Sequence, residues 1–320
     1  MEMKKDKILF IINPISGVGK QKKVEKALEK VLDKTLFDYE VEYTEYAHHA
    51  TVISLQAAIR KVDIVVSVGG DGSINDCVRG LIGTDVTLGI IPTGSGNGLA
   101  RTLNIPLNVE DAIEVLNKRK RATIDTVKVN NKIYASIAGI GFDALVAKEF
   151  RKTKIRGFNK YLSLILQLYP FYESQNYEME IDGERIESNA LFICFANSNQ
   201  YGYNTIIAPS AKLDDGFMQI SVVKKVPLVM LPWTAQLLIF RNFDKSIYVK
   251  TYKAKEVKVM NNYSRLVNLD GESVVMDKEL HFTINPKSLK VIIPEDNGKE
   301  RKEPSWHNLF NQPIFPIRNF

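Results

Sequence analysis

The first 118 residues alternate between short apolar runs and longer stretches in which apolar residues recur at helical spacing. Asp63–Val68 is mainly apolar, which is typical of a strand covered on both faces of a sheet. Thr51–Lys61 before it and Val109–Lys118 after it show the helical spacing. Strands that alternate with helices predict a mostly parallel sheet with helices on both faces. The other elements predicted in this part of the chain are strands at Lys7–Ile12, Tyr39–Thr44 and Thr87–Ile91, and helices at Gln21–Asp33, after Gly72 and at Asn97–Leu103.

Near Arg121 the pattern changes to shorter strands joined by turns. Ala122–Val129 and Ile133–Ala138 are predicted strands on either side of a turn at Asn130-Asn131, and Asp182-Gly183 marks a second hairpin. Many strands and few helices favour an antiparallel β-sandwich. The other strands predicted in this part are Glu178–Ile181, Glu184–Glu187, Ala190–Ala196, Phe217–Val223, Ser246–Lys250, Glu256–Met260, His281–Ile284 and Leu289–Ile293.

We therefore expect an α/β plus β protein with two domains. A chain of 320 residues is long for one domain, and the change of pattern divides it into an α/β domain over 1–121 and a β-rich domain over 122–294. Residues 295–320 are polar and then interrupted by prolines, which predicts a tail that either extends or packs back on the first domain.

The composition is that of an ordinary water-soluble protein with a mild excess of positive charge. A net charge of +6 suits an anionic partner, either phosphate groups or an anionic membrane surface. Cys77 and Cys194 are the only cysteines, which argues against a disulfide framework or a structural zinc site. No segment has the roughly 18 apolar residues of a membrane span, and the run Ile8–Ile12 is too short for a signal peptide. We expect a cytoplasmic protein whose membrane contact is peripheral.

Three glycine-containing loops follow predicted strands of the first domain. They are Asn13–Lys20, Gly69–Ser73 and Pro92–Arg101, and the first lacks the spacing of a P-loop. Because the carboxyl ends of parallel strands meet at one edge of a sheet, these loops gather free backbone N–H groups and helix N-termini there. The sequence therefore predicts a phosphate-binding edge.

Asp71 lies among the glycines of the second loop. A carboxylate beside a phosphate group repels it unless a cation or a proton transfer is involved, so Asp71 is interpreted as a magnesium or water ligand, or as a base for an accepting hydroxyl group. The alternative is a structural role in which Asp71 caps the following helix.

Taken together, the motifs NPxSGxGK, GGDGSxND and PTGSGNGLAR resemble the catalytic domain of the diacylglycerol kinase family. The resemblance implies a first domain like that of phosphofructokinases and NAD kinases, with ATP and magnesium bound between two domains. It implies that ATP is contacted by Asn13, Ser16, Gly17, Thr44, Gly69, Gly70, Asp71, Gly72, Ser73, Asn75, Gly94, Ser95 and Asn97.

The resemblance continues through Leu213–Gly216 and Asn268–Glu272. It implies that Asp71 serves catalysis together with Asp270 or Glu272, one of which would be the base for the lipid hydroxyl group. It also implies a structural magnesium held by backbone oxygens of Lys212 and Phe217 and by the side chain of Asp215. From spacing alone, Asp270-Gly271-Glu272 would be a surface hairpin turn.

The lipid acceptor stays open between diacylglycerol and a sphingoid base or ceramide. The third loop has Gly94-Ser95-Gly96-Asn97, which resembles sphingosine and ceramide kinases more than the GTxND of bacterial diacylglycerol kinases. Two alternatives to a lipid kinase are an NAD kinase-like enzyme for a small molecule and a catalytically silent module that binds lipid or nucleotide. The four histidines show no metal-ligand spacing and are interpreted as ordinary.

Five basic residues between Arg151 and Lys160 precede the apolar stretch Tyr161–Tyr172. Such a pair of segments can settle on an anionic bilayer, whereas the alternative is a solvated loop that leads into a core helix. The expected partners are ATP, the lipid, an anionic membrane surface and a second copy of the chain in a homodimer. No nucleic acid is expected.

Overall fold

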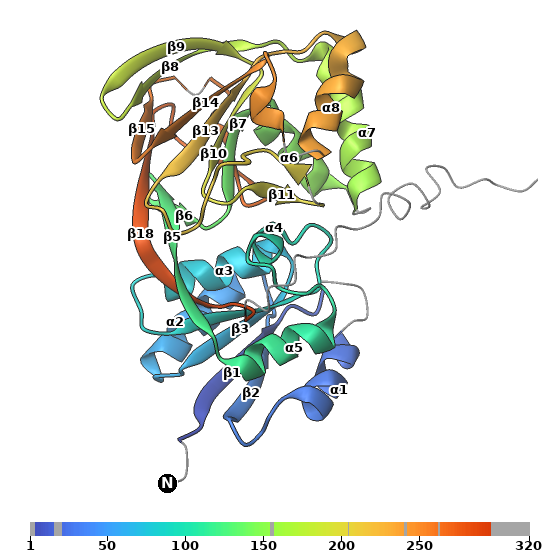
Figure 1. The fold of residues 1–320 in the computed structure, drawn as a ribbon, viewed down its shortest axis with the longest axis vertical. Coiled ribbons are helices and arrows are strands. Elements are labelled where there is room, and N and C mark those ends of the chain that lie inside the picture. The colour runs from blue at the N-terminus through green and yellow to red at the C-terminus, as the bar shows by residue number, and fades with distance from the viewer. Residues whose placement is uncertain are drawn as a thin grey trace, which may run out of the picture.

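The computed structural model describes residues 4–15, 21–153, 157–203, 205–239, 242–261 and 263–295, which form two lobes (Figure 1). The first lobe contains four parallel strands in the order β2-β1-β3-β4. Their bounds are β1 (Asp6–Ile12), β2 (Phe37–Tyr43), β3 (Ile64–Gly69) and β4 (Thr87–Pro92). The helices of this lobe are α1 (Gln21–Val31), α2 (His49–Ile59), α3 (Asp71–Leu81), α4 (Gly98–Thr102) and α5 (Val109–Lys118).

Both faces of this parallel sheet are covered. All six residues of β3 and of β4 are buried, as their apolar composition predicts. Helix α1 packs against α5 and α2 packs against α3 (Figure 1). The start of α5 is fixed locally, because the side chain of Asn108 accepts hydrogen bonds from the backbone N–H groups of Glu110 and Asp111.

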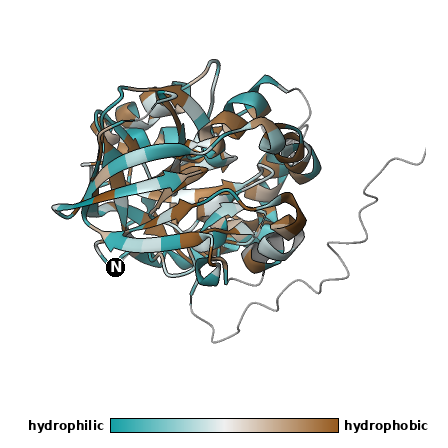
Figure 2. Ribbon diagram, turned by 90° about the horizontal axis from the view of Figure 1, so that it is seen from above, coloured by the Kyte–Doolittle hydropathy of each residue, from teal (hydrophilic) through white to brown (hydrophobic). Residues whose placement is uncertain are grey.

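The second lobe is a sandwich of two antiparallel sheets, as predicted. The strand Gln175–Ile181 alternates exposed and buried residues, and Figure 2 colours hydrophilic residues teal and hydrophobic residues brown. The two inner faces meet in one core, where the rings of Phe195 and Phe282 stack with centroids 3.8 Å apart. One sheet contains β5 (Arg121–Val129), β6 (Lys132–Tyr134), β8 (Gln175–Ile181), β9 (Glu184–Ala190), β15 (Glu256–Val259) and β18 (Leu280–Ile292). The other contains β7 (Ile137–Gly141), β10 (Phe192–Ala196), β13 (Met218–Val223), β14 (Val249–Ala254), β16 (Leu266–Leu269) and β17 (Glu272–Val275).

Two long strands join the lobes. Strand β18 pairs with β5 along most of its length, and near its end Lys290 and Val291 pair in parallel with β4. The strands predicted separately at His281–Ile284 and Leu289–Ile293 are therefore one strand, with an irregularity between Asn285 and Leu289. The first lobe's sheet and one sheet of the sandwich thus form a single ten-stranded sheet.

One predicted strand is divided by the structure. Ile133–Ala138 separates into β6 and β7, which belong to different sheets, so the chain crosses between sheets at Ala135 and Ser136. This corner contributes to the candidate active site, because its backbone N–H groups point at a carboxylate.

The second lobe also contains more helix than its strand-rich sequence predicts. The apolar stretch Tyr161–Tyr172 is mainly helical, while Lys154 and Arg156 before it and residues 296–320 lie outside the described residues. None of the described helices combines the length and apolar character needed to cross a membrane. The additional elements are α6 (Phe142–Lys152), α7 (Phe158–Leu168), α8 (Leu231–Ile239), the short 3-10 helices η1 (Tyr169–Phe171), η2 (Leu228–Met230) and η3 (Phe243–Lys245), and a hairpin of β11 (Gln200–Gly202) and β12 (Thr205–Ile206).

Candidate active site

The glycine loops meet at the carboxyl edge of the parallel sheet. The Nδ2 of Asn13 donates to the hydroxyl oxygen of Ser73 at 3.0 Å, which ties the first loop to the second. The backbone N–H of Thr93 and of Gly94 donate to the carbonyl oxygen of Gly69 at 2.9 and 3.3 Å, which ties the second loop to the third. Thr44 follows β2 at the same edge, where its N–H donates to Ile12. Ser16 and Gly17 lie outside the described residues.

Two glycines in these loops are required by close packing, one between loops and one within a loop. A Cβ added to Gly94 would lie 2.4 Å from the Cα of Gly70, and one added to Gly69 would lie 2.5 Å from the Cβ of Ser73. By contrast, a Cβ on Gly72 would meet nothing within 4 Å, and Ser95 is exposed. The open side of the loops therefore lies at Gly72 and Ser95, next to the N-terminus of α3, where backbone N–H groups favour an anion.

Asp71 links the second loop to the third. It is the first residue of α3, and its carboxylate accepts hydrogen bonds from the backbone N–H of Asn97 at 2.8 Å and of Gly98 at 2.6 Å. Asp71 thus caps α4 rather than the helix that it begins. Burial raises the pKa of its carboxyl group, against the opposing effect of these hydrogen bonds.

Asn97 fastens the third loop to the second lobe. Its backbone is left-handed, with φ 56°, and its Nδ2 donates to the carbonyl oxygen of Gly94 at 2.8 Å. Asn97 also forms an isolated antiparallel bridge with Gly202 of β11. The loop predicted to bind nucleotide is therefore held in place from both lobes.

Asp270 lies in the turn between β16 and β17 of the second lobe. Its carboxylate accepts three backbone hydrogen bonds from the β6–β7 corner: Ala135 at 3.0 Å, Ser136 at 3.0 Å and Ile137 at 2.7 Å. Burial is the main cause that raises the pKa of Asp270 to about 6, and the nearby Asp71 carboxylate raises it further while the backbone hydrogen bonds lower it. The structure therefore brings Asp71 and Asp270, which are 199 positions apart in the sequence, into electrostatic contact.

Asn75 joins α3 to this turn. With its amide oriented so that both ends are satisfied, Nδ2 donates to Oδ2 of Asp270 at 3.2 Å and Oδ1 accepts from Arg79 at 3.1 Å. Asn75, predicted to contact ATP, is thus buried between α3 and the second lobe.

Glu272 is surrounded by basic side chains from α3, from α6 and from the N-cap of α2. Its carboxylate lies 3.5 Å from Arg79 of α3, 3.4 Å from Arg151 of α6 and 3.6 Å from His48 at the start of α2. Asp76 completes the cluster, 2.9 Å from the Nδ1 of His48. His48, interpreted as ordinary from the sequence, therefore belongs to an ionic cluster between the lobes, which no local spacing signals.

Two further residues, which sequence reasoning missed, support the Asp270 turn from behind. The Nδ2 of Asn268 donates to the carboxylate of Asp143 in α6 at 2.9 Å, and its Oδ1 accepts from the backbone N–H of Gly271 at 3.0 Å. Burial raises the pKa of Asp143 to about 6. A Cβ on Gly139 would lie 1.8 Å from the same carboxylate, so a glycine leaves room for it. An Asp among the apolar residues Phe142, Ala144 and Val146 was the available signal in the sequence.

The residues expected to hold a structural magnesium share one loop, and the metal site itself stays a prediction. One Oδ of Asp215 accepts from the backbone N–H of Phe217 at 3.1 Å, and the other lies 2.9 Å from the Nζ of Lys253. Lys212 is exposed in the same loop. A carboxylate and two carbonyl oxygens are ligands that magnesium accepts, and Oδ2 of Asp215 is buried and, apart from its ion pair with Lys253, has no hydrogen-bond partner among the residues that the structure describes. In the described residues no group of three or more His, Cys, Asp or Glu side chains could hold a metal ion.

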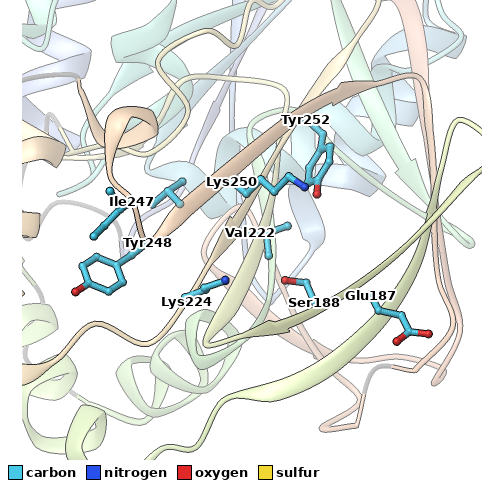
Figure 3. A pocket seen from close by; sticks show the side chains of 9 residues that line it. Glu187, Ser188, Val222, Lys224, Ile247, Tyr248, Lys250 and Tyr252 are labelled. Atoms are coloured by element: carbon cyan, nitrogen blue, oxygen red, sulfur yellow. The ribbon is translucent and has the colours of Figure 1, made fainter.

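A pocket of about 350 Å³ lies in a different part of the second lobe, beside β13 and β14 (Figure 3). Glu187, Lys224, Ile247 and Lys250 are among its lining residues. None of the predicted site residues lines it, so this pocket is separate from the candidate active site.

The comparisons with known proteins agree with this architecture. A family model described as the diacylglycerol kinase catalytic domain matches residues 7–129, and one described as the YegS C-terminal NAD kinase beta sandwich-like domain matches residues 136–293. A diacylglycerol kinase of Bacillus subtilis (strain 168) is 30% identical over 279 residues, which are 84% of this chain and 90% of that protein. One of Staphylococcus saprophyticus is 27% identical over 267 residues, covering 82% and 88%.

Solved structures share the fold. A crystal structure of a Bacillus anthracis protein superposes with a TM-score of 0.72 at 24% identity, covering 91% of this chain and 98% of that chain. A second, of a diacylglycerol kinase from the same organism, gives 0.68 at 22% identity, covering 91% and 97%. At these identities the likeness establishes the two-lobe fold alone.

Proposed function

Because this chain belongs to the diacylglycerol kinase family, we propose that it transfers the γ-phosphoryl group of ATP to the hydroxyl group of a lipid. The observation that supports the proposal most directly is that α3, which begins with Asp71 at the glycine loops, is joined to Asp270 of the second lobe through Asn75. In this proposal residues 1–121 bind ATP and residues 122–294 present the lipid.

The first lobe binds the phosphate groups of ATP in this mechanism. The N-terminus of α3 and the open side of the loops at Gly72 and Ser95 offer backbone donors and a positive helix end to the phosphates. Magnesium bound to ATP would neutralise phosphate charge, and Asp71, the first residue of α3, supplies a carboxylate at this edge. Such positioning and electrostatic stabilisation supply most of the rate enhancement in phosphoryl transfer.

Among the three predicted catalytic carboxylates, Asp71 is the best candidate for the base. A carboxylate offers about four acceptor positions, and Asp270 uses four: three backbone N–H groups and Asn75. The Glu272 carboxylate is already engaged by Arg79 and Arg151 and lies 3.6 Å from His48. Asp71 accepts two hydrogen bonds from other residues, and burial raises its pKa.

The reaction then proceeds in balanced steps. An Oδ of Asp71 takes the proton of the lipid hydroxyl group while the hydroxyl oxygen attacks the γ-phosphorus. The bond between the γ-phosphorus and the bridging oxygen breaks, ADP leaves with the electron pair, and the proton passes from Asp71 to solvent. Asp270 positions the site, since it ties the β16–β17 turn to the β6–β7 corner.

Diacylglycerol is the first acceptor to test, because the relatives found are named diacylglycerol kinases. The third loop, with Ser95 and Asn97, keeps a sphingoid base or ceramide as the second. The decisive assay measures transfer of labelled γ-phosphate from magnesium-ATP to these lipids in detergent, with NAD and fructose 6-phosphate as controls.

Three outcomes separate the candidate functions. Labelled phospholipid supports the lipid kinase and names its acceptor. Labelled NADP without any lipid product would replace it with an NAD kinase-like enzyme. ATP that raises the thermal stability of the protein without any labelled product would indicate a silent binding module.

A further inference from the structure

Exposed apolar side chains concentrate on two segments of the second lobe that are far apart in the sequence. Eight of the twenty large apolar side chains found exposed in the described residues lie in α7–η1 and in η2–α8. Phe171 is 86% exposed, Val229 78% and Trp233 65%. We call these residues the apolar face; its members are Phe158, Leu162, Leu166, Phe171, Leu228, Val229, Met230 and Trp233.

The two segments form one continuous surface. Ile165 and Leu168 of α7 and Leu231 of α8 pack against the same buried cluster around Phe142 and Tyr169. The hydroxyl of Tyr169 donates to the carbonyl oxygen of Val226 at 2.6 Å, and the N–H of Val226 donates back to it at 2.8 Å. Helices α7 and α8 accordingly lie at the same edge of the second lobe in Figure 1. The inner sides of the two segments hold them together, and the apolar face is what remains outside.

The charges around the apolar face are positive. Residues 157–172 and 224–239 contain Lys160, Lys224 and Lys225 and no Asp or Glu. At the end of α6, which packs against α7, Arg151 and Lys152 are 57% and 61% exposed and pair with Glu272 and Glu149. Apolar and aromatic side chains within a rim of Lys and Arg are typical of surfaces that lie in the interface of an anionic membrane.

We propose that the apolar face docks on an anionic phospholipid bilayer. The inference rests on the proposed function, since it states how the second lobe reaches a lipid acceptor. Helix α6 connects the two sites: Asp143 near its start supports the Asp270 turn, and Arg151 near its end pairs with Glu272. Docking through α7 and α8 therefore places the membrane next to the element that supports the candidate active site.

A second copy of the chain fits this face less well than a bilayer. A two-fold interface sets the same patch against itself, so its lysine rim would face an identical rim and repel it. Anionic headgroups complement the rim, and the bilayer accepts the apolar side chains.

The test measures co-sedimentation of the full chain with phosphatidylcholine vesicles that contain or lack phosphatidylglycerol. We expect the double variant V229S/W233S to lower the partition coefficient on the anionic vesicles by about tenfold or more. Serine replaces two exposed apolar side chains that the bilayer would otherwise bury. The matched control is Ile59→Ser: Ile59 is 80% exposed but lies at the end of α2 in the first lobe, away from the apolar face, so binding is unchanged. Lys224→Glu weakens binding to the anionic vesicles only.

Two results would overturn the docking proposal. One is vesicle binding by V229S/W233S equal to that of the parent chain. The other is a change from dimer to monomer in size-exclusion chromatography with vesicle binding unaltered, which would assign the apolar face to a second copy. If thermal unfolding shows that the double variant does not fold, it is replaced by Phe171→Ser, since Phe171 is more exposed than Val229 or Trp233.

Turnover in detergent separates the two proposals. A parent chain that binds vesicles through the apolar face but phosphorylates no lipid contradicts the kinase and leaves the docking in place. A parent chain that phosphorylates lipid in detergent, with variants that bind vesicles normally, contradicts the docking alone.

Discussion

The variant Asp71→Asn tests whether the carboxylate of Asp71 acts in catalysis or only caps a helix. The carboxylate accepts from the N–H of Asn97 at 2.8 Å and of Gly98 at 2.6 Å. An amide has one oxygen, so one of these N–H groups would face an NH2 group and lose its partner. A hydrogen bond to a charged group contributes roughly 1.5–3 kcal/mol, so we expect unfolding to require about 1–3 kcal/mol less.

The effect on turnover should be far larger than this loss of stability predicts. Removal of a general base typically costs about 10²–10⁴ in rate, because the acceptor hydroxyl must then lose its proton to water. The assay pairs γ-phosphate transfer to the lipid with urea unfolding of the same preparation, at a temperature where the variant is fully folded.

The matched control is Asn108→Ala, which removes a cap from α5 in the same lobe. Asn108 also accepts from two backbone N–H groups, those of Glu110 and Asp111. We expect it to lose about 1 kcal/mol of stability and no turnover. If Asp71→Asn loses no more turnover than Asn108→Ala, Asp71 is a cap and the base must be sought elsewhere.

Three further predictions concern the neighbouring residues. Glu272→Gln removes the charged partner of Arg79 and Arg151, so stability should change by about 1 kcal/mol. Because Asp71 is the proposed base, turnover should change by less than about tenfold. A loss of about 10³ in turnover would make Glu272 the base instead. Gly94→Ala should lower stability by about 1–3 kcal/mol in urea unfolding, because the new Cβ would meet the backbone of Gly70. Gly72→Ala should not lower stability in this way, because a Cβ there would meet open space. Equal stabilities of the two variants would refute the packing argument. Burial raises the pKa of Asp270 to about 6, above the ordinary value of an aspartate, so the folded chain binds a proton more tightly than the unfolded chain. Stability should therefore fall as the pH rises from about 4 to 6. Asp270→Asn should reduce this dependence of stability on pH, and an unchanged pH profile would contradict the argument.

Local sequence patterns predict the individual elements of the first lobe. The helix over Val109–Lys118 is predicted with its observed bounds, because helical spacing and the capping side chain of Asn108 act within a few residues. The turn at Asp182-Gly183 is predictable for the same reason, and both residues adopt positive φ there. The fold class and the family resemblance are confirmed by the sandwich and by the comparisons.

Tertiary structure decided how these elements combine into a site. The sequence identified Asp71 and Asp270, but only the fold shows that the second is held by the corner at 135–137 and lies near the first. The glycines of the loops could be predicted, while their use in packing Gly70 against Gly94 could not.

The same limit applies to the ionic cluster around Glu272 and to the apolar face. Glu272 meets His48 and Arg79 only because β17 approaches α2 and α3, and Phe171 and Val229 share one surface only because Tyr169 binds Val226. Periodicity, capping and turn chemistry depend on residues a few positions apart, so the sequence alone determines the elements. Contacts between residues more than 50 positions apart depend on strand order and lobe packing, and these are fixed by burial of the whole chain.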